Sequence, residues 1–299
     1  MRDRIKIIVN PVSGKGKALR LAEAVADQLR KQGCTVELQQ TRKSGDARVF
    51  AGDCAGFSAL AATGGDGTVN EVLNGLPDGG GPPLAMIPSG TANVLAKELR
   101  LPRDPEGLAR MLREGREMAW DLGIERRSGR RFLLFASAGY DAHVVHIFHA
   151  ARTGPIRMWQ YVWWGLKSLL GYTAPRIVVE IDGIAVTSEA AWVTIANVAC
   201  YGGPLVFTPK ASPENQTFEV MVQVGAGRWT VMKMFWFAIW RWMTGAQFSM
   251  KGVTYHQGKQ VKLTSADGRP VPLQVDGDPN GHLPGEFDII PGGIRVLAP

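Results

Sequence analysis

The sequence predicts an α/β domain followed by a mainly β domain. In the first part, short apolar runs alternate with stretches of helical periodicity, which is the pattern of a parallel sheet with flanking helices. In the second part, period-two runs and Asp-Gly turns dominate, which is typical of an antiparallel sandwich. We therefore expect an α/β domain over residues 1–125 and a β-sandwich domain over 126–299, and we leave open that the C-terminal end returns to the first domain.

The elements of the first domain follow from apolar spacing and from capping residues. The expected strands are 5–10, 36–41, 58–63 and 83–88. In the first expected helix, 17–33, residues Ala18, Ala22, Val25 and Leu29 share one face, and Gly33 suits the C-terminal end. The other expected helices are 69–76, 91–99 and one that begins at Asp104-Pro105, where an acidic N-cap precedes a first-turn proline.

The elements of the second domain are mainly strands. Residues 176–186 and 261–275 each read as a hairpin around an Asp-Gly turn, and RRSGRR (126–131) reads as a further hairpin turn. Further strands are expected at 191–199, 218–224 and 287–291.

Composition excludes several classes of protein. The 299 residues include 34 Lys and Arg against 27 Asp and Glu, a net charge of +7 without a basic cluster, so we expect no nucleic-acid partner. The three scattered cysteines suit a reducing cytosol, and MRDRIKIIVNP at the start reads as a first strand and not as a signal peptide. A membrane-spanning helix is not expected, because no run of roughly 18 uncharged apolar residues occurs. The sequence leaves the oligomeric state, including a homodimer, open.

Three glycine-containing loops follow strands of the first domain and precede helices. They are NPVSGKGKA (10–18), TGGDGTVNE (63–71) and PSGTANV (88–94). Glycine lets the backbone approach phosphate oxygens, and a helix N-terminus favours an anion. An aspartate beside phosphate suits a cation-bound nucleotide, so Asp66 indicates Mg²⁺. The spacings match neither the Walker loop nor the dinucleotide fingerprint.

These loops also resemble a known family. NPVSGKGKA, GGDGTVNEVLNGL (64–76) and PSGTANVLA (88–96), in this order, are similar to the diacylglycerol kinase catalytic-domain family, which includes bacterial soluble lipid kinases and the sphingosine and ceramide kinases. The resemblance continues through WDLG (120–123), SAGYDAHVV (137–145), ANVACYGGPLVFTPKA (196–211) and QVDGDP (274–279). It implies an NAD-kinase/diacylglycerol-kinase-like fold and transfer of the γ-phosphate of ATP, with Mg²⁺, to the hydroxyl of diacylglycerol or a related lipid.

The resemblance also implies roles for individual residues. Lys15 is expected near the phosphates, Asp66 in the shell of Mg²⁺-ATP, and Asp141 at the lipid headgroup. Asp278 is expected to accept the proton of the lipid hydroxyl, with Asp276 as the fallback. The ATP site is expected to include Asn10, Thr41, Gly64, Gly65, Asp66, Gly67, Thr68, Asn70, Ser89, Gly90 and Thr91.

Two departures from the family pattern affect these expectations. The family has Asp-Gly-Glu where this chain has Asp276-Gly277-Asp278, so the base is one methylene shorter, and DGDP also suits a simple turn. The family has Asp-Asp-Gly near position 215, where it holds a structural Mg²⁺ linked to the acid of WDLG. This chain has Glu-Asn-Gln there, which leaves Asp121 and Asn215 as the candidate ligands of a weakened metal site.

Two tryptophan-rich segments suit the surface of a membrane. Residues 158–172 and 228–248 combine tryptophans with lysine and arginine on apolar helices. Burial of the same aromatics in the core is the competing interpretation. The favoured hypothesis is a cytoplasmic lipid kinase that associates with the inner face of the membrane. The alternatives are an NAD-kinase-like kinase of a soluble substrate, or a catalytically impaired protein that binds nucleotide or lipid.

Overall fold

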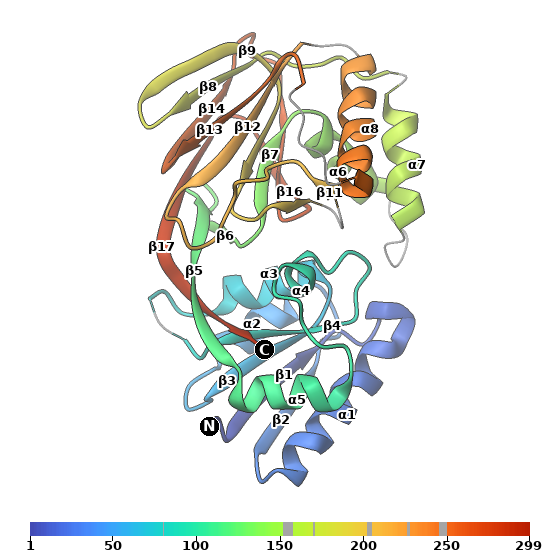
Figure 1. The fold of residues 1–299 in the computed structure, drawn as a ribbon, viewed down its shortest axis with the longest axis vertical. Helices are drawn as coiled ribbons and strands as arrows, with labels where there is room; N and C mark the ends of the chain where they lie inside the picture. Colours follow the sequence, from blue (N-terminus) through green and yellow to red (C-terminus); the bar gives the residue numbers. More distant parts are fainter. Residues whose placement is uncertain (80, 152–157, 170, 202–204, 226–227, 245–249) are drawn as a thin grey trace. The chain divides into compact units, whose positions relative to one another are not determined.

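The chain forms two compact units. The structure is a computed structural model that describes all residues except 80, 152–157, 170, 202–204, 226–227 and 245–249. Unit 1 comprises Met1–Trp120 and Pro291–Pro299, and unit 2 comprises Asp121–Ile290. Two strands contribute residues to both units, namely β5 (Arg116–Glu125) and β17 (Gly285–Ala298). The C-terminal residues therefore belong to the same unit as the N-terminus (Figure 1).

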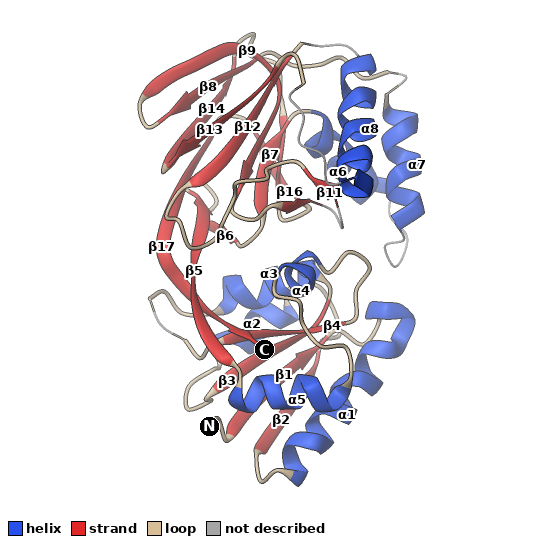
Figure 2. Ribbon diagram, viewed as in Figure 1, coloured by secondary structure: helices blue, strands red, loops and turns tan. Residues whose placement is uncertain are grey.

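Unit 1 is an α/β domain with a parallel sheet in the order β2-β1-β3-β4, extended by the end of β17 beside β4. Helices flank the strands, and α1 packs with α5 while α2 packs with α3 (Figure 2). The strands are β1 (Arg4–Val9), β2 (Thr35–Gln40), β3 (Ala59–Gly64) and β4 (Leu84–Pro88). The helices are α1 (Lys17–Lys31), α2 (Asp46–Gly52), α3 (Asp66–Gly75), α4 (Val94–Glu98) and α5 (Pro105–Glu114).

The central strands of unit 1 are apolar because helices cover both faces of the sheet. Ile5, Ile7 and Ile8 of β1 are fully buried, and each such side chain contributes roughly 1.5–3 kcal/mol by leaving water. Lys6 is also buried, but its Nζ donates to the backbone oxygen of Asp53 at 2.6 Å at the edge of the core. At the start of α5, Asp104 accepts from the Gly107 amide at 2.7 Å with Pro105 in the first turn, as predicted.

Unit 2 is mainly β. Its strand order is β16-β15-β7-β9-β8-β14-β17, and β12 and β13 extend the sheet from β9. The strands are β6 (Arg130–Phe132), β7 (Phe135–Ala138), β8 (Ile177–Ile181), β9 (Ile184–Ala196), β12 (Phe218–Val224), β13 (Val253–Gly258), β14 (Gln260–Ser265), β15 (Pro272–Val275) and β16 (Asp278–His282). A small ribbon joins β10 (Cys200–Tyr201) to β11 (Leu205–Val206). The helices are α6 (Tyr140–Ala151), α7 (Met158–Ser168) and α8 (Arg228–Thr244).

Strand alternation separates two apolar clusters in unit 2. On β12, Val220 and Val222 enter the core of the sandwich, whereas Met221 points to the opposite face. That opposite face packs against helices, because Val144 of α6 and Val231 of α8 join Met221 in the second cluster. The predicted fold class, an α/β domain followed by a β sandwich, is confirmed.

Two details of the sequence prediction were wrong. Strands β14 and β15 do not form the hairpin expected over 261–275, because β14 pairs with β8 and β17 while β15 pairs with β7 and β16. The hairpin instead joins β15 to β16 through Asp276-Gly277. Helices α2 and α6 were not predicted, since α2 is only seven residues long and α6 begins inside a segment that carried chemical motifs.

Candidate active site

The predicted ATP-binding residues lie at the carboxyl ends of the four neighbouring parallel strands of unit 1. Asn10 follows β1, Thr41 follows β2, the run from Gly64 to Asn70 closes β3 and opens α3, and Ser89 follows β4. Parallel strands end at the same edge of a sheet, and open α/β sheets bind their ligands there. The structure thus places these residues at one edge of the sheet.

The three glycine loops contact one another through their backbones. A Cβ on Gly90 would lie 2.4 Å from the Gly65 Cα, and a Cβ on Gly14 would lie 2.4 Å from the backbone oxygen of Ser89. The amides of Ser89 and Gly90 both donate to the Gly64 oxygen, at 3.0 and 3.1 Å. Glycine at 14 and 90 is therefore required for loop packing.

The first loop enters its helix through three consecutive left-handed residues. Gly14, Lys15 and Gly16 have φ values of 58°, 59° and 83°, and the side chain of Lys15 is exposed. The left-handed region costs a lysine roughly 1–2 kcal/mol, so the loop geometry imposes it. Among the described residues, no side chain caps α1 or α3, whose N-caps are Gly16 and Gly65. The first-turn amides of both helices therefore keep the partial positive charge that suits an anion.

Asp66 connects two of the loops. Its Oδ1 accepts from the Leu95 amide at 3.2 Å, so the second loop caps the helix that follows the third loop. Burial raises the pKa of Asp66, and hydrogen bonds from the backbone at Val94 and Leu95 oppose that rise. The observed contacts are structural, and the predicted place of Asp66 in the shell of Mg²⁺-ATP stays a prediction.

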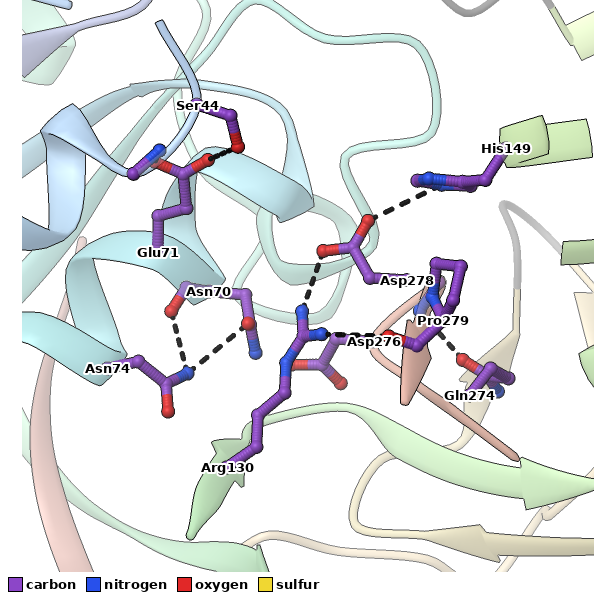
Figure 3. Close-up of polar contacts among 12 residues, drawn as sticks. Ser44, Asn70, Glu71, Asn74, Arg130, His149, Gln274, Asp276, Asp278 and Pro279 are labelled. Carbon is purple, nitrogen blue, oxygen red and sulfur yellow. Dashed lines mark hydrogen bonds and ion pairs between the residues drawn. The ribbon is translucent and has the colours of Figure 1, made fainter. Parts of the chain in front are cut away.

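Helix α3 holds further predicted residues in fixed positions. The Thr68 amide donates to the Gly65 oxygen at 3.0 Å, and Asn70 is buried with its Oδ1 accepting from Asn74 Nδ2 at 3.2 Å (Figure 3). Glu71 of the same helix accepts from the Ser44 hydroxyl at 3.2 Å and from the Gly45 amide at 3.0 Å. These contacts tie the loop that follows β2 and Thr41 to α3.

In unit 2, the Asp276-Gly277 pair forms the turn of the β15–β16 hairpin. The two residues have φ values of 48° and 84°, as a two-residue hairpin turn requires. The Asp276 carboxylate is buried and accepts from the amides of Leu133, Leu134 and Phe135, each at 3.0 Å. This carboxylate therefore fixes the backbone at the point where the chain enters β7, and the observed contacts give it a structural role.

Asp278 follows the turn and lies in a different environment. Its Oδ2 accepts from Arg130 Nη2 at 2.7 Å, and its Oδ1 lies 3.5 Å from His149 Nε2 (Figure 3). The Asp278 side chain is 33% exposed, so it can reach a substrate group. Of the two acids in this turn, Asp278 is the more exposed, and its role as proton acceptor stays a prediction.

Asp141 is buried in the first turn of α6. Its Oδ2 accepts from the hydroxyls of Ser137 and Tyr201, the latter at 2.6 Å, and from Gln274 Nε2 at 3.4 Å. Burial raises the pKa of Asp141, while these hydrogen bonds oppose the rise. Contact with a lipid headgroup stays a prediction for this residue.

The expected structural Mg²⁺ site does not fit the residues present. Asp121 Oδ2 accepts directly from the Gln216 amide at 2.6 Å, and Asn215 Oδ1 accepts from the Thr217 amide at 3.2 Å. Backbone N–H groups thus occupy oxygens that a hard cation needs as ligands. Among the described residues, no group of three acidic, histidine or cysteine side chains is placed to hold a metal.

The structure adds partners that sequence reasoning missed. Arg130 was assigned to a hairpin turn, which is confirmed, because β5 pairs with β6 around it. Its contact with Asp278 spans 148 residues, and His149 approaches the same carboxylate from α6. No local spacing in the sequence signals contacts between residues so far apart.

The two tryptophan-rich helices expose much of their aromatic surface. On α8, Val231, Met234 and Phe235 pack on the second apolar cluster of unit 2. The opposite face carries a stripe of exposed side chains at helical spacing, namely Trp229, Met232, Trp236, Trp240 and Met243. On α7, Trp163 is 60% exposed, and the Lys167 ammonium lies over the Trp164 ring. The side chains of Trp159, Tyr161, Arg241 and Trp242 lie outside the described residues.

Comparisons with known proteins agree with this architecture. Residues 4–124 match the model of the diacylglycerol kinase catalytic domain, and residues 135–298 match that of the YegS C-terminal NAD kinase beta sandwich-like domain. Since the second match alone covers more than half of the chain, the protein belongs to this family of diacylglycerol kinase-type proteins.

Individual relatives match the chain over both of its units. The chain is 27% identical to a diacylglycerol kinase of Staphylococcus carnosus, covering 100% of this chain and 96% of the relative. It is 28% identical to a diacylglycerol kinase of Staphylococcus aureus, with 93% of that protein covered. A crystal structure of a putative diacylglycerol kinase from Bacillus anthracis has the same fold, with a TM-score of 0.80 and 20% identity, covering 100% of this chain and 98% of that one.

None of the described helices has the length and apolar character needed to cross a bilayer.

Proposed function

We propose that this protein is an ATP-dependent lipid kinase that transfers the γ-phosphate of Mg²⁺-ATP to the hydroxyl of diacylglycerol or a related lipid. The observation that carries the proposal is the meeting of three glycine loops at the carboxyl edge of the unit 1 sheet, beside the uncapped α1 and α3. Phosphoryl transfer depends mostly on positioning and on charge neutralisation, which backbone amides and a cation supply.

The residues of each unit have separate tasks in this proposal. In unit 1, the amides of the loops and of α1 and α3 hold the triphosphate, and Lys15 adds a positive charge. Asp66 fixes the second loop against α4. In unit 2, Asp278 receives the proton of the lipid hydroxyl, while Asp276 maintains the turn that places Asp278.

The second part of the proposal is that unit 2 meets its substrate at a membrane. The exposed tryptophans of α7 and α8 suit the interface of a bilayer, and Lys167 and Lys233 suit anionic headgroups. Proteins rarely expose several tryptophans on one helix face without a partner for that face. We therefore propose peripheral attachment to the cytoplasmic side of a membrane.

The test is phosphate transfer from γ-labelled ATP and Mg²⁺ to lipids in mixed micelles. Diacylglycerol, ceramide, sphingosine and phosphatidylglycerol are offered separately, with NAD as the soluble alternative. We expect transfer to a lipid, and we expect Asp278→Asn to lower kcat by about 10²–10⁴. Transfer to NAD alone would favour the soluble-substrate alternative, and no transfer with intact ATP binding would favour a binding protein without catalysis.

A further inference from the structure

The surroundings of Asp278 differ from those of an isolated carboxylate. Its Oδ2 is held by Arg130 Nη2 at 2.7 Å, and Arg130 Nη1 also donates to the backbone oxygen of Pro279 at 3.4 Å. Arginine thus fixes the carboxylate relative to its own strand. The other oxygen, Oδ1, faces His149 Nε2 at 3.5 Å (Figure 3). All three side chains retain access to solvent, since Arg130 and His149 are each 23% exposed.

This arrangement affects what happens to a proton taken up by Asp278. Protonation of the carboxylate removes the negative charge that pairs with Arg130, whose Nη2 lies 2.7 Å from Asp278 Oδ2. If the proton passes to His149, the carboxylate regains its charge and faces two cations. Free carboxyl groups titrate near pH 4 and free imidazole at about pH 6.5, so an imidazole holds the proton better at neutral pH.

We propose that His149 is the proton relay of the lipid-kinase reaction, taking from Asp278 the proton that Asp278 receives from the substrate hydroxyl. The inference rests on the proposed function. In the step, the substrate O–H bond breaks and its oxygen bonds to the γ-phosphorus as the bond from that phosphorus to ADP breaks. The proton moves to Asp278 Oδ1 and then to His149 Nε2. The product state is an imidazolium beside a carboxylate, and the partly exposed imidazolium loses the proton to water.

In any pH experiment, the titration of other charged groups near α6 must be distinguished from the titration of His149. Helix α6 packs against α7 and against strands β7, β9, β15 and β16. Strands β7 and β15 carry no titratable side chain. Apart from Asp278 and His149, the titratable groups with described side chains on α6, on its neighbours and on β6 are Arg130, Arg131, Tyr140, Asp141, His143, His146, Lys167, Glu189 and His282. Burial lowers the pKa of His143 and of His146, so at neutral pH neither imidazole is well suited to accept the proton.

The kinetic test compares His149→Gln with His282→Gln. His282 lies on β16, the strand of Asp278, and its ring contacts His146 and not Asp278. In wild type we expect kcat to fall below about pH 6–7, where imidazoles titrate. In His149→Gln we expect kcat to be lower by about tenfold or more and that limb of the pH profile to vanish. His282→Gln should keep both the rate and the limb. Added imidazole should restore part of the rate of His149→Ala.

Measuring the pKa of His149 tests the inference without depending on turnover. The pKa of His149 is measured by NMR in the wild type and in Asp278→Asn, which removes the facing carboxylate and leaves Arg130 in place. We expect the pKa of His149 to fall in Asp278→Asn. An unchanged pKa, or a His149→Gln enzyme with the wild-type rate and pH profile, would overturn the relay. Absence of transfer to any lipid by the wild type would instead count against the proposed function.

Discussion

Two aspartates of one hairpin turn show how strongly the surroundings decide the role of a residue. Asp276 is buried and accepts three backbone amides, whereas Asp278, two residues later, is partly exposed between an arginine and a histidine. The Asp-Gly turn produces this difference, because it reverses the chain between the two side chains. The contacts thus give Asp276 a structural role, while the catalytic role is proposed for Asp278.

Replacing Asp276 should destabilise the fold. Asp276→Ala leaves three buried amides without an acceptor and puts alanine at a φ of 48°, so we expect a loss of about 3 kcal/mol or more in the free energy of unfolding. The measurement is urea unfolding at neutral pH. Asp278→Asn is the matched control, and we expect it to lower activity while changing stability by less than about 1 kcal/mol. Equal losses in the two variants would contradict the separate roles.

Asp141 should make stability depend on pH. Burial raises its pKa in the folded state above the unfolded value of about 3.9, so the protonated carboxyl favours folding below that pH. This contribution is lost as the pH rises through the folded-state pKa. We expect the unfolding free energy of wild type, relative to Asp141→Asn, to fall between pH 4 and the folded-state value. Urea unfolding across this range is the measurement, and parallel curves for the two proteins would show that Asp141 does not titrate differently on folding.

Helix α8 has two faces with different partners. One face contributes Val231 and Met234 to the core of unit 2, and the other exposes Trp229, Trp236 and Trp240. Its sequence is apolar almost all round, a pattern that fits a buried helix as well as a membrane-associated one. The packing decides which tryptophans are outside.

Removal of two exposed tryptophans should weaken membrane binding without unfolding the protein. For Trp236→Ala combined with Trp240→Ala, we expect partitioning onto phosphatidylglycerol vesicles to fall at least about tenfold, because each indole leaves the interface. Vesicle sedimentation is the measurement, and the melting temperature should be unchanged. Ile184→Ala is the control, since Ile184 is 71% exposed on a strand of the sandwich. Equal binding by both variants and the wild type would remove α8 as the docking surface.

At the scale of the whole molecule, unit 1 depends on residues from the far end of the chain. Val296 pairs with Leu84 of β4, and Val296 and Leu297 are fully buried. Arg295 donates to the backbone oxygen of Gly81 at 2.7 Å and pairs with Glu117 at 3.0 Å. The N-terminal 120 residues are therefore an incomplete domain.

A fragment of residues 1–120 should fail to fold by itself. Without residues 291–299 the fragment exposes the edge of β4 and loses buried apolar area, so we expect no cooperative thermal transition. Fusing 291–299 to the fragment through a flexible linker should restore the transition. Circular dichroism melts of the two fragments are the measurement. A cooperative melt of 1–120 alone would show that the C-terminal strand is dispensable for unit 1.

The sequence by itself determined the features that depend on neighbouring residues. The apolar runs predicted β1 to β4, and Asp104 and Pro105 predicted the start of α5. The glycine loops predicted the sheet edge at which the residues expected to bind nucleotide lie together. Periodicity, capping and turn chemistry act over a few residues, so these signals can be recognised in a single sequence.

Only the tertiary structure decided the features that join distant residues. The tertiary contacts include the pairing of β14 with β8, the contacts of Asp278 with Arg130 and His149, and the hydrogen bond from the Gln216 amide to Asp121. They link positions that are about 80 to 148 residues apart, and no local pattern encodes such pairs. Which of two neighbouring acids is buried, and which tryptophans face outward, depends on what packs against each side chain. That packing is a property of the folded molecule and not of any segment.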